Sequence, residues 1–186
     1  MRILLINNGT KYLEKLMLLL EKTGTIVIEG NLNHPQDFDL AVLSGGHNCS
    51  VVNHGNYYQK EIEFLKKTEI PVLGICLGAE LIAYVFGAKL EHLEREEKGF
   101  IDIDVLQLDA IFDGVQNFKV FESHKWAITQ LSSDLIGLAR SMDGFEVIKH
   151  KDLPLYGFQF HPELFEDQTV GAKIFTNLLN ILSFKD

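Results

Sequence analysis

The chain has few cysteines and relatively few basic residues, and each shortage argues against a class of protein. Its 186 residues include only two cysteines, Cys49 and Cys76. Two thiols do not make a disulfide framework, so a reducing compartment is the simpler interpretation. Lysine and arginine number 17 against 26 acidic residues, a formal net charge of −9. This balance argues against non-specific nucleic-acid binding, because such binding needs basic side chains to neutralise phosphates.

Long hydrophobic runs are also missing. Met1-Arg2 leads into only four apolar residues, which is too few for the apolar segment of a signal peptide. No run approaches the roughly 20 residues that a membrane-spanning helix needs. We therefore expect a cytoplasmic protein that does not bind membranes. A length of 186 residues, 46% of them hydrophobic, predicts one domain, residues 1–186, with a full-sized core.

The first half of the sequence alternates apolar segments with amphipathic ones. It predicts strands at 2–7, 25–30, 39–46 and 71–76, and helices at 11–22, 57–68 and 77–87. Strands that are apolar throughout and alternate with helices predict a parallel sheet covered on both faces. In such sheets the active site lies beyond the carboxyl ends of the strands. Asn8-Gly9, Gly45-Gly46 and Cys76 all lie at predicted ends of this kind.

The second half has a different pattern. It predicts six short strands with little helix between them, at 89–94, 100–108, 118–124, 135–141, 145–151 and 155–161, and a final helix at 169–182. We expect some of these strands to be antiparallel. The predicted fold class is therefore α/β, with a mostly parallel central sheet, helices on both faces in a flavodoxin-like arrangement, and a small antiparallel extension.

Cys76 lies in the segment GICLG (74–78), between a predicted strand and a predicted helix. A cysteine in an apolar segment is usually a small buried hydrophobe. The flanking glycines change this interpretation, because a strand, a G-x-C-x-G turn and a helix form the thiol version of a nucleophile elbow. Such a turn exposes the sulfur near a helix N-terminus, which favours the thiolate. It also places the Leu77 amide to donate to a developing oxyanion.

A thiol nucleophile needs a base, and one of the seven histidines has a suitable position. His161 ends the apolar segment predicted as a strand, Pro162 interrupts that strand, and Glu163 follows. Residues i and i+2 of an extended segment point to the same side, so the Glu163 carboxylate can orient the His161 imidazole. Cys76, His161 and Glu163 are therefore predicted as nucleophile, base and orienting acid.

Four short motifs make the sequence similar to the class I (triad-type) glutamine amidotransferases. They are SGG at 44–46, GICLG at 74–78, ESH at 122–124 and QFHPE at 159–163, and the resemblance extends over nearly the whole chain. It implies that glutamine is hydrolysed to glutamate and ammonia through a γ-glutamyl thioester on Cys76. It also implies that the backbone amides of Gly46 and Leu77 form the oxyanion hole.

The resemblance further implies how glutamine is held and where ammonia goes. Glutamine would be bound by Gly45, Glu80 and the segment that contains Ser123, Lys125 and Trp126. Ammonia would pass to a synthetase partner that uses ATP and magnesium, while the hydrolysis itself needs no cofactor. No metal site is predicted, because no group of histidines, cysteines and carboxylates has metal-ligand spacing in the sequence.

Within the family, the sequence is most similar to the amidotransferase subunit of GMP synthase. The segments LPLYGFQFHPE (153–163) and GAKIFTNL (171–178) carry this similarity. It implies an ATP-pyrophosphatase partner and xanthosine monophosphate (XMP) as that partner's substrate. The sequence departs from the family pattern at several places: Glu80 replaces the usual glutamine, His47 replaces a proline, the start reads NNGTK instead of DNGGQ, and LFEDQT (164–169) lacks the His-Thr pair usual after HPE in GMP synthases. We expect the charge of Glu80 to raise the pKa of the neighbouring thiol.

Three alternatives remain open at this point. One is the amidotransferase subunit of anthranilate or aminodeoxychorismate synthase, which differs only in its partner. Another is a γ-glutamyl peptidase or hydrolase that uses the same three residues, an alternative that Glu80 and His47 favour. The last is a regulatory or binding protein without enzymatic activity. The presence of Cys76, His161 and Glu163 together argues against that last alternative.

Overall fold

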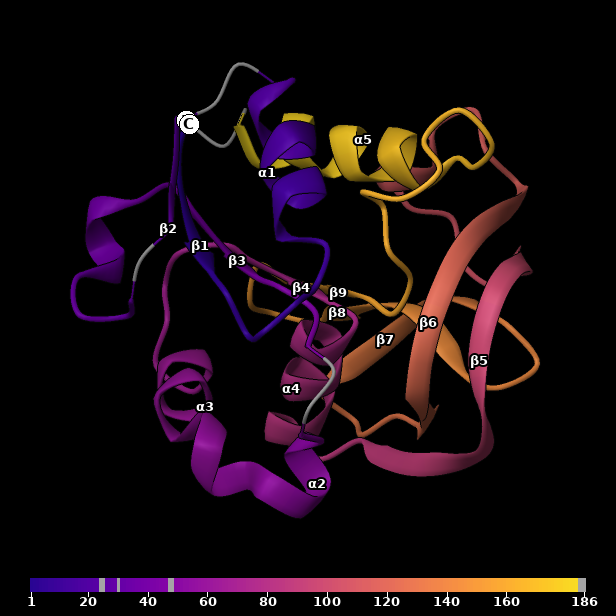
Figure 1. Ribbon diagram of the computed structural model, residues 1–186, viewed down its shortest axis with the longest axis horizontal. Helices are drawn as coiled ribbons and strands as arrows, with labels where there is room; N and C mark the ends of the chain where they lie inside the picture. The colour runs from indigo at the N-terminus through magenta and orange to yellow at the C-terminus, as the bar shows by residue number, and fades with distance from the viewer. Residues whose placement is uncertain (24–25, 30, 47–48, 184–186) are drawn as a thin grey trace.

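The computed structural model describes residues 1–23, 26–29, 31–46 and 49–183. In these residues nine strands form one sheet, in the order β2-β1-β3-β4-β9-β8-β7-β5-β6 (Figure 1). The strands are β1 (Arg2–Ile6), β2 (Ile26–Glu29), β3 (Leu40–Leu43), β4 (Val72–Ile75), β5 (Lys89–Val105), β6 (Asn117–Gln130), β7 (Leu135–Arg140), β8 (Phe145–His150) and β9 (Leu155–Phe158). The helices are α1 (Leu13–Glu21), α2 (Val51–His54), α3 (Gln59–Leu65), α4 (Leu77–Val85) and α5 (Gly171–Ser183), with 3-10 turns at Pro35–Asp37, Gly55–Tyr58 and Ala110–Phe112.

The parallel part of the sheet consists of β2, β1, β3, β4 and β9. Every residue of β3 and β4 is buried, as expected for strands covered on both faces. In Figure 1, α1 and α5 lie on one face of this sheet and α2, α3 and α4 lie on the other. Two buried clusters fill the two layers, one around Leu20 and Phe175, the other around Leu65 and Leu81. The predicted α/β class is confirmed.

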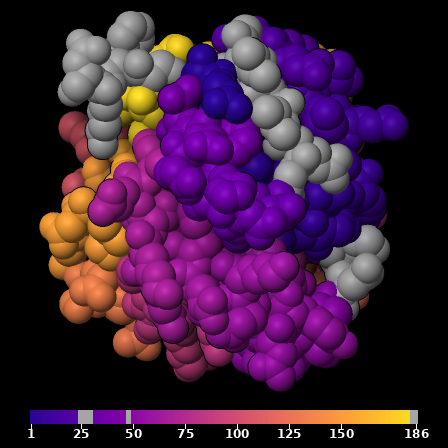
Figure 2. Space-filling view, turned by 90° about the vertical axis from the view of Figure 1, so that its left-hand side faces the viewer, coloured from indigo at the N-terminus to yellow at the C-terminus, as the bar shows by residue number. Residues whose placement is uncertain are grey.

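The edge formed by β2 belongs to the first half of the chain. Figure 2 looks onto that side of the molecule and shows it covered chiefly by residues of the first half. The second half of the chain builds the opposite side, where β5, β6 and β7 curl away from the parallel strands (Figure 1). The molecule therefore has a parallel half and an antiparallel half, which meet where β9 pairs with β8.

The antiparallel half is larger than the small extension that the sequence predicts. The segments 89–94 and 100–108 form parts of one strand, β5, rather than two separate strands. The intervening residues are charged, but they stay in the strand because most of their side chains face solvent. Strand β5 pairs with β6 along nearly its whole length, with a register shift between His92 and Glu97. A polar run therefore does not end a strand whose outer face is exposed.

Two further boundaries differ from the prediction. Helix α2 lies in a segment that reads as a polar loop, and the side chain of Ser50 caps it by accepting a hydrogen bond from the Asn53 amide at 3.2 Å. Strand β9 ends at Phe158 instead of His161, because the backbone leaves β8 after Gln159 and reaches β6 at His161. Gln159 donates its N–H to the Glu146 carbonyl, and His161 donates its N–H to the Phe121 carbonyl, each at 2.9 Å.

No helix within the described ranges combines the length and apolar character that crossing a bilayer requires.

Candidate active site

Cys76 occupies a sharp turn between β4 and α4. Its φ is 50° and its ψ is −108°, in the left-handed region that residues with a side chain rarely adopt. The flanking glycines have a steric reason: a β-carbon on Gly74 would overlap the backbone of Gly78, and one on Gly78 would overlap the Leu43 carbonyl. The turn is further fixed from β9, since the Cys76 N–H donates to the Phe158 carbonyl at 2.7 Å.

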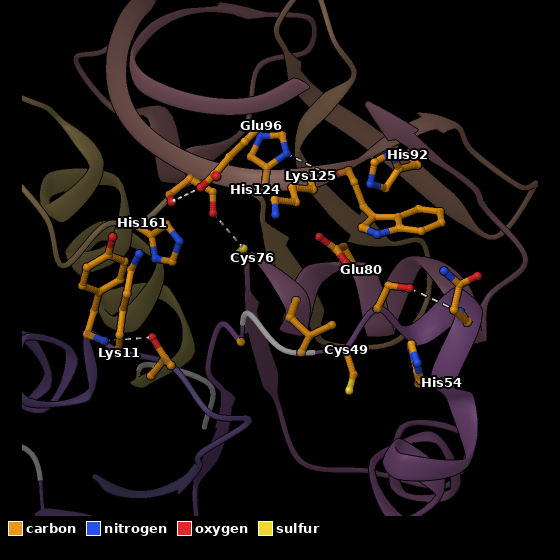
Figure 3. A pocket seen from close by; sticks show the side chains of 18 residues that line it. Lys11, Cys49, His54, Cys76, Glu80, His92, Glu96, His124, Lys125 and His161 are labelled. Carbon is orange, nitrogen blue, oxygen red and sulfur yellow. Dashed lines mark hydrogen bonds between the residues drawn. The ribbon is translucent and has the colours of Figure 1, made fainter. Parts of the chain in front are cut away.

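Cys76 opens into a cleft of about 450 Å³ beyond the carboxyl ends of the parallel strands. Figure 3 shows Cys76 at its centre, between His161 on one side and Glu80 on the other. The cleft is lined by Thr10, Lys11, Tyr12, Gly46, Cys49, Ser50, Asn53, His54, Cys76, Leu77, Glu80, His92, Glu96, Ser123, His124, Lys125, Trp126 and His161. The two halves of the molecule therefore both contribute to it.

His161 is held from two sides. Its Nδ1 lies 2.8 Å from Oε1 of Glu163, and both residues are only 3% exposed. The Tyr12 ring contacts the imidazole edge to face, with ring centroids 5.1 Å apart. The histidine and the glutamate meet across a turn at Pro162, not along the extended segment that the sequence suggests. The contact leaves Nε2 of His161 as the ring nitrogen that can accept a proton from the thiol.

Gly45 lies between Cys76 and His161. A β-carbon added to Gly45 would come within 3.1 Å of the His161 Cε1 atom and 3.5 Å of the Cys76 Cβ atom. Gly46 is equally confined, because a β-carbon there would overlap the carbonyl oxygen of Asn8. The glycine pair therefore lets the loop after β3 approach both side chains.

The Cys76 thiol does not have the low pKa that a helix N-terminus favours. Burial is the largest influence and raises its pKa well above the usual value, and the nearby Glu80 carboxylate raises it further. The Leu77 amide lowers the pKa, as expected at the start of a helix, but Glu163 and Glu122 add to the upward shift. The influences that raise the pKa of the Cys76 thiol therefore exceed the one that lowers it, contrary to the expected thiolate. The expected increase of this pKa by Glu80 is present.

Glu80 is a buried carboxyl group on the first turn of α4. It is 4% exposed, and Nε2 of Gln159 donates a hydrogen bond to its Oε1 at 3.3 Å. Burial raises the pKa of Glu80 to about 7, although His124 and the Gln159 amide oppose that shift. Glu80 consequently changes its charge near neutral pH, directly beside the nucleophile position.

The segment from Ser123 to Trp126 forms the wall opposite α4. The Ser123 carbonyl lies 4.0 Å from the Cys76 sulfur, and the Ser123 hydroxyl donates to Glu96 at 3.3 Å. Lys125 is exposed, and the Trp126 ring packs edge to face against His92. The structure thus brings the predicted binding residues of this segment to the cleft, together with Glu80. His47, the other departure from the family pattern, lies outside the described residues.

Several features of the cleft were not predicted from the sequence. Lys11 and Tyr12 enter it from the loop after β1, where the turn at Asn8-Gly9 was the available signal. A buried group formed by Glu122, His124 and Glu146 brings one potential ligand atom of each residue within 4.8 Å of the others. Glu146 comes from β8, so no local spacing in the sequence indicates this group.

The chain is similar to known proteins of one family. The model of the family described as glutamine amidotransferase class-I matches residues 4–181. A glutamine-hydrolyzing GMP synthase subunit from Pyrococcus abyssi is 35% identical over 170 residues, which cover 87% of this chain and 89% of that protein. The corresponding subunit from Methanothermobacter thermautotrophicus is 37% identical over 148 residues, covering 78% of this chain and 76% of that protein.

Solved structures agree with the sequence matches. The crystal structure of a putative GMP synthase subunit from Thermoplasma acidophilum has a TM-score of 0.85 at 27% identity, covering 98% of this chain and 94% of that one. A glutamine amidotransferase from Thermotoga maritima, at 20% identity, shares the fold with a TM-score of 0.78 and coverage of 99% and 98%. The fold is that of an α/β glutamine amidotransferase enzyme. The chain belongs to the class I glutamine amidotransferase family, and the family resemblance stated above is confirmed.

Proposed function

We propose that the chain is the glutamine-hydrolysing subunit of a two-subunit GMP synthase. The Cys76 sulfur attacks the side-chain amide carbon of glutamine, the C–N bond breaks, and ammonia leaves. Water then hydrolyses the γ-glutamyl thioester on Cys76 and releases glutamate. The relatives that cover most of this chain are glutamine-hydrolysing subunits of GMP synthases, which supports an ATP-pyrophosphatase partner that uses the ammonia on XMP.

His161 moves the protons of this reaction. Because burial raises the pKa of Cys76, the thiol keeps its proton until the C–S bond forms. His161 accepts that proton at Nε2, while its Nδ1–H donates to Glu163. The imidazolium then gives the proton to the departing nitrogen. In the second half of the reaction His161 takes a proton from water and returns it to the thiol.

The cleft suits the two ends of glutamine. The Gly46 and Leu77 amides stabilise the oxyanion, helped by the position of Leu77 at the start of α4. Charges of both signs line the remainder, Lys11 and Lys125 with Glu80 and Glu96. This mixture matches an α-amino acid, which carries an ammonium and a carboxylate. None of these steps uses a cofactor, and we assign ATP and magnesium to the partner's reaction.

The observation that carries the proposal is the buried pair of His161 and Glu163, 2.8 Å apart, beside a cysteine held at a strained strand–helix turn. The test is glutamate release from glutamine by the purified chain, alone and with the ATP-pyrophosphatase subunit, XMP, ATP and magnesium. Cys76→Ala should reduce release by at least about 10⁴-fold and abolish the thioester seen by mass spectrometry.

The outcomes separate the class of reaction from the partner. Release that depends on Cys76 and rises with the ATP-pyrophosphatase subunit supports both. Release that rises only with an anthranilate or aminodeoxychorismate synthase subunit keeps the reaction and replaces the partner. Release that persists in Cys76→Ala contradicts the mechanism, because no other group is assigned as nucleophile.

One observation favours a second candidate, a γ-glutamyl peptidase or hydrolase. Glu80 places a carboxyl group of raised pKa, about 7, in the cleft, where an ionised form would repel the glutamine carboxylate. Hydrolysis of γ-glutamyl dipeptides measured beside glutamine separates the two functions. Faster turnover of the dipeptides, reversed in favour of glutamine by Glu80→Gln, would replace the primary proposal.

A further inference from the structure

A second buried histidine lies beside the cleft, and both of its ring nitrogens are occupied. His124 Nδ1 lies 2.9 Å from the Trp126 carbonyl oxygen, and Nε2 lies 2.9 Å from Oε2 of Glu122. A carbonyl oxygen only accepts hydrogen bonds, so Nδ1 must carry a hydrogen. The contact between Nε2 and Glu122 then requires one further proton, either on the imidazole or on the carboxyl group.

Glu122 makes a second contact that also needs a proton. One side-chain oxygen of Glu122 lies within 4.8 Å of one side-chain oxygen of Glu146 on β8. Oε1 of Glu122 and Oε2 of Glu146 are buried without an N–H or O–H donor among the described residues. Two ionised carboxylates this close repel each other, and a proton held between them removes that repulsion. The Ser141 hydroxyl completes the series by donating to Oε1 of Glu146 at 2.7 Å.

These contacts bridge strands that are not neighbours in the sheet. The sheet order places β7 and β5 between β8 and β6. Because Glu122 and His124 belong to β6 and Glu146 to β8, the bridge fixes β6 where it folds back toward the centre of the molecule. All three residues are at most 4% exposed.

The same stretch of β6 touches the proposed catalytic pair. The Phe121 carbonyl accepts the His161 N–H at 2.9 Å, and the Ser123 carbonyl lies 4.0 Å from the Cys76 sulfur. The bridge ends on the carbonyl of Trp126. Any change in the bridge therefore moves the wall of the cleft that the proposed function assigns to the amino-acid end of glutamine.

We propose that Glu122, His124 and Glu146 form a proton-sharing bridge that positions the Ser123–Trp126 segment for glutamine, an inference that rests on the proposed function. These are positioning residues, because they act on the substrate through the backbone of β6. Loss of a shared proton at alkaline pH leaves two carboxylates facing each other and opens the bridge. The expected effect is a rise in KM for glutamine with little change in kcat.

The surroundings of the bridge favour retention of its protons. From β5, Glu97 faces Glu122, with Arg95 beside Glu97. From the turn after β7, Asp143 faces Glu122, and from α4, Glu80 faces His124. These facing groups are mainly acidic, and burial together with like charge raises the pKa of Glu122 to about 7 and that of Glu146 well above the usual value. The bridge is therefore intact at neutral and mildly acidic pH.

Two substitutions of Glu146 distinguish proton sharing from simple packing. In Glu146→Gln, the amide N–H donates to Glu122 without a shared proton and the amide oxygen still accepts from Ser141, so the contact between residues 122 and 146 no longer depends on pH. KM for glutamine should stay within about twofold of wild type at neutral pH, and its alkaline rise should become smaller, because only the proton between His124 and Glu122 can then be lost. In Glu146→Leu the bridge is broken, and KM should rise about tenfold at every pH while kcat changes less than about threefold.

The measurement is KM and kcat for glutamine from mildly acidic to alkaline pH, with Glu91→Gln, an exposed acid on β5, as the control that should match wild type. Glutamine affinity is measured in parallel by calorimetry in Cys76→Ser chains, where no turnover occurs. An unchanged KM in folded Glu146→Leu overturns the proposal. An alkaline rise that is as large in Glu146→Gln as in wild type also overturns it.

Two further readouts do not depend on activity. The infrared carbonyl band of a protonated carboxylic acid should be present at neutral pH in Glu80→Gln, where Glu80 cannot contribute to it, and weaker when Glu146→Gln is added; its absence in Glu80→Gln overturns the proposal. Stoichiometric binding of Zn²⁺ or Mn²⁺ that Glu146→Leu removes would make the cluster a cation site and overturn it as well. If wild type neither binds glutamine nor releases glutamate, the proposed function fails, and the infrared band alone decides the existence of the shared proton.

Discussion

Two of the histidines that line the cleft are buried, and each of these two is paired with a glutamate two positions away in the sequence. His161 contacts Glu163 at 2.8 Å in the parallel half, and His124 contacts Glu122 at 2.9 Å in the antiparallel half. All four residues are buried. The pairs differ in the ring nitrogen involved. The carboxylate binds Nδ1 of His161 but Nε2 of His124, whose Nδ1 is already bound to a backbone carbonyl.

This difference decides what each imidazole can do. A histidine with one nitrogen still available can accept a proton from a neighbouring thiol and pass it on. A histidine with both nitrogens engaged inside the protein can only hold its partners in place. Burial and proximity to a carboxylate are common to both histidines, so neither feature identifies the base. The base is identified by the ring nitrogen that is still available to accept a proton, Nε2 of His161.

The different roles of the two histidines are tested most directly by removing each imidazole in turn. His161→Ala should lower kcat for glutamine by at least about 10³-fold, because no group then accepts the thiol proton. His124→Ala should mainly raise KM and lower kcat by less than about tenfold. Steady-state kinetics at saturating glutamine measures both, with folding checked by circular dichroism. A larger loss of kcat in His124→Ala would reverse the assignment of the base.

A smaller effect is expected from the acid that orients the base. Glu163→Gln should lower kcat by about 10²-fold, because the neutral amide stabilises the imidazolium less and can donate to Nδ1, which leaves the wrong tautomer. Glu122→Gln is the matched control, since it makes the same change in the other pair and should alter KM more than kcat. Equal losses of kcat in the two variants would show that the pairs do not differ in role.

The smallest effect concerns Glu80, which lies on the opposite side of Cys76 from His161 (Figure 3). Its folded-state pKa of about 7 exceeds the ordinary value of 4.5. The folded chain therefore binds more protons than the unfolded chain across that window, and the free energy of unfolding falls as pH rises through it. The loss from this one group is on the order of 3 kcal/mol.

Glu80→Gln should remove that loss and leave the chain more stable than wild type at mildly alkaline pH, with little difference at acidic pH. Urea denaturation at both pH values measures the effect. The same variant should let Cys76 react a few-fold faster with iodoacetamide at neutral pH, because one of the carboxylates that raise the thiol pKa is gone. A pH slope identical to that of wild type would mean that Glu80 is not the group that titrates.

The parallel half of the fold could be predicted from the sequence because its signals are local. An apolar run such as 40–43 is buried whatever surrounds it, and the glycines at 74 and 78 mark the Cys76 turn directly. The bounds of β5 could not be predicted, because residues 89–92 and 97–104 pair with the distant strand β6, while the charged side chains between them face solvent. The contacts of the site are likewise of two kinds, local in the sequence and between distant segments. His161 and Glu163 are neighbours in the chain, whereas the contact of Glu122 with Glu146 exists only after β6 folds back over β8.

Strand β9 is the last strand to be synthesised, yet it lies in the middle of the sheet between β4 and β8. The Cys76 turn depends on it, because the Cys76 amide donates to the Phe158 carbonyl, and His161 follows three residues later. A growing chain that ends before β9 therefore carries the thiol without its backbone support and without its base. Since chains emerge from the ribosome N-terminus first, we expect unfinished copies to be inactive, because they lack both β9 and the proposed base.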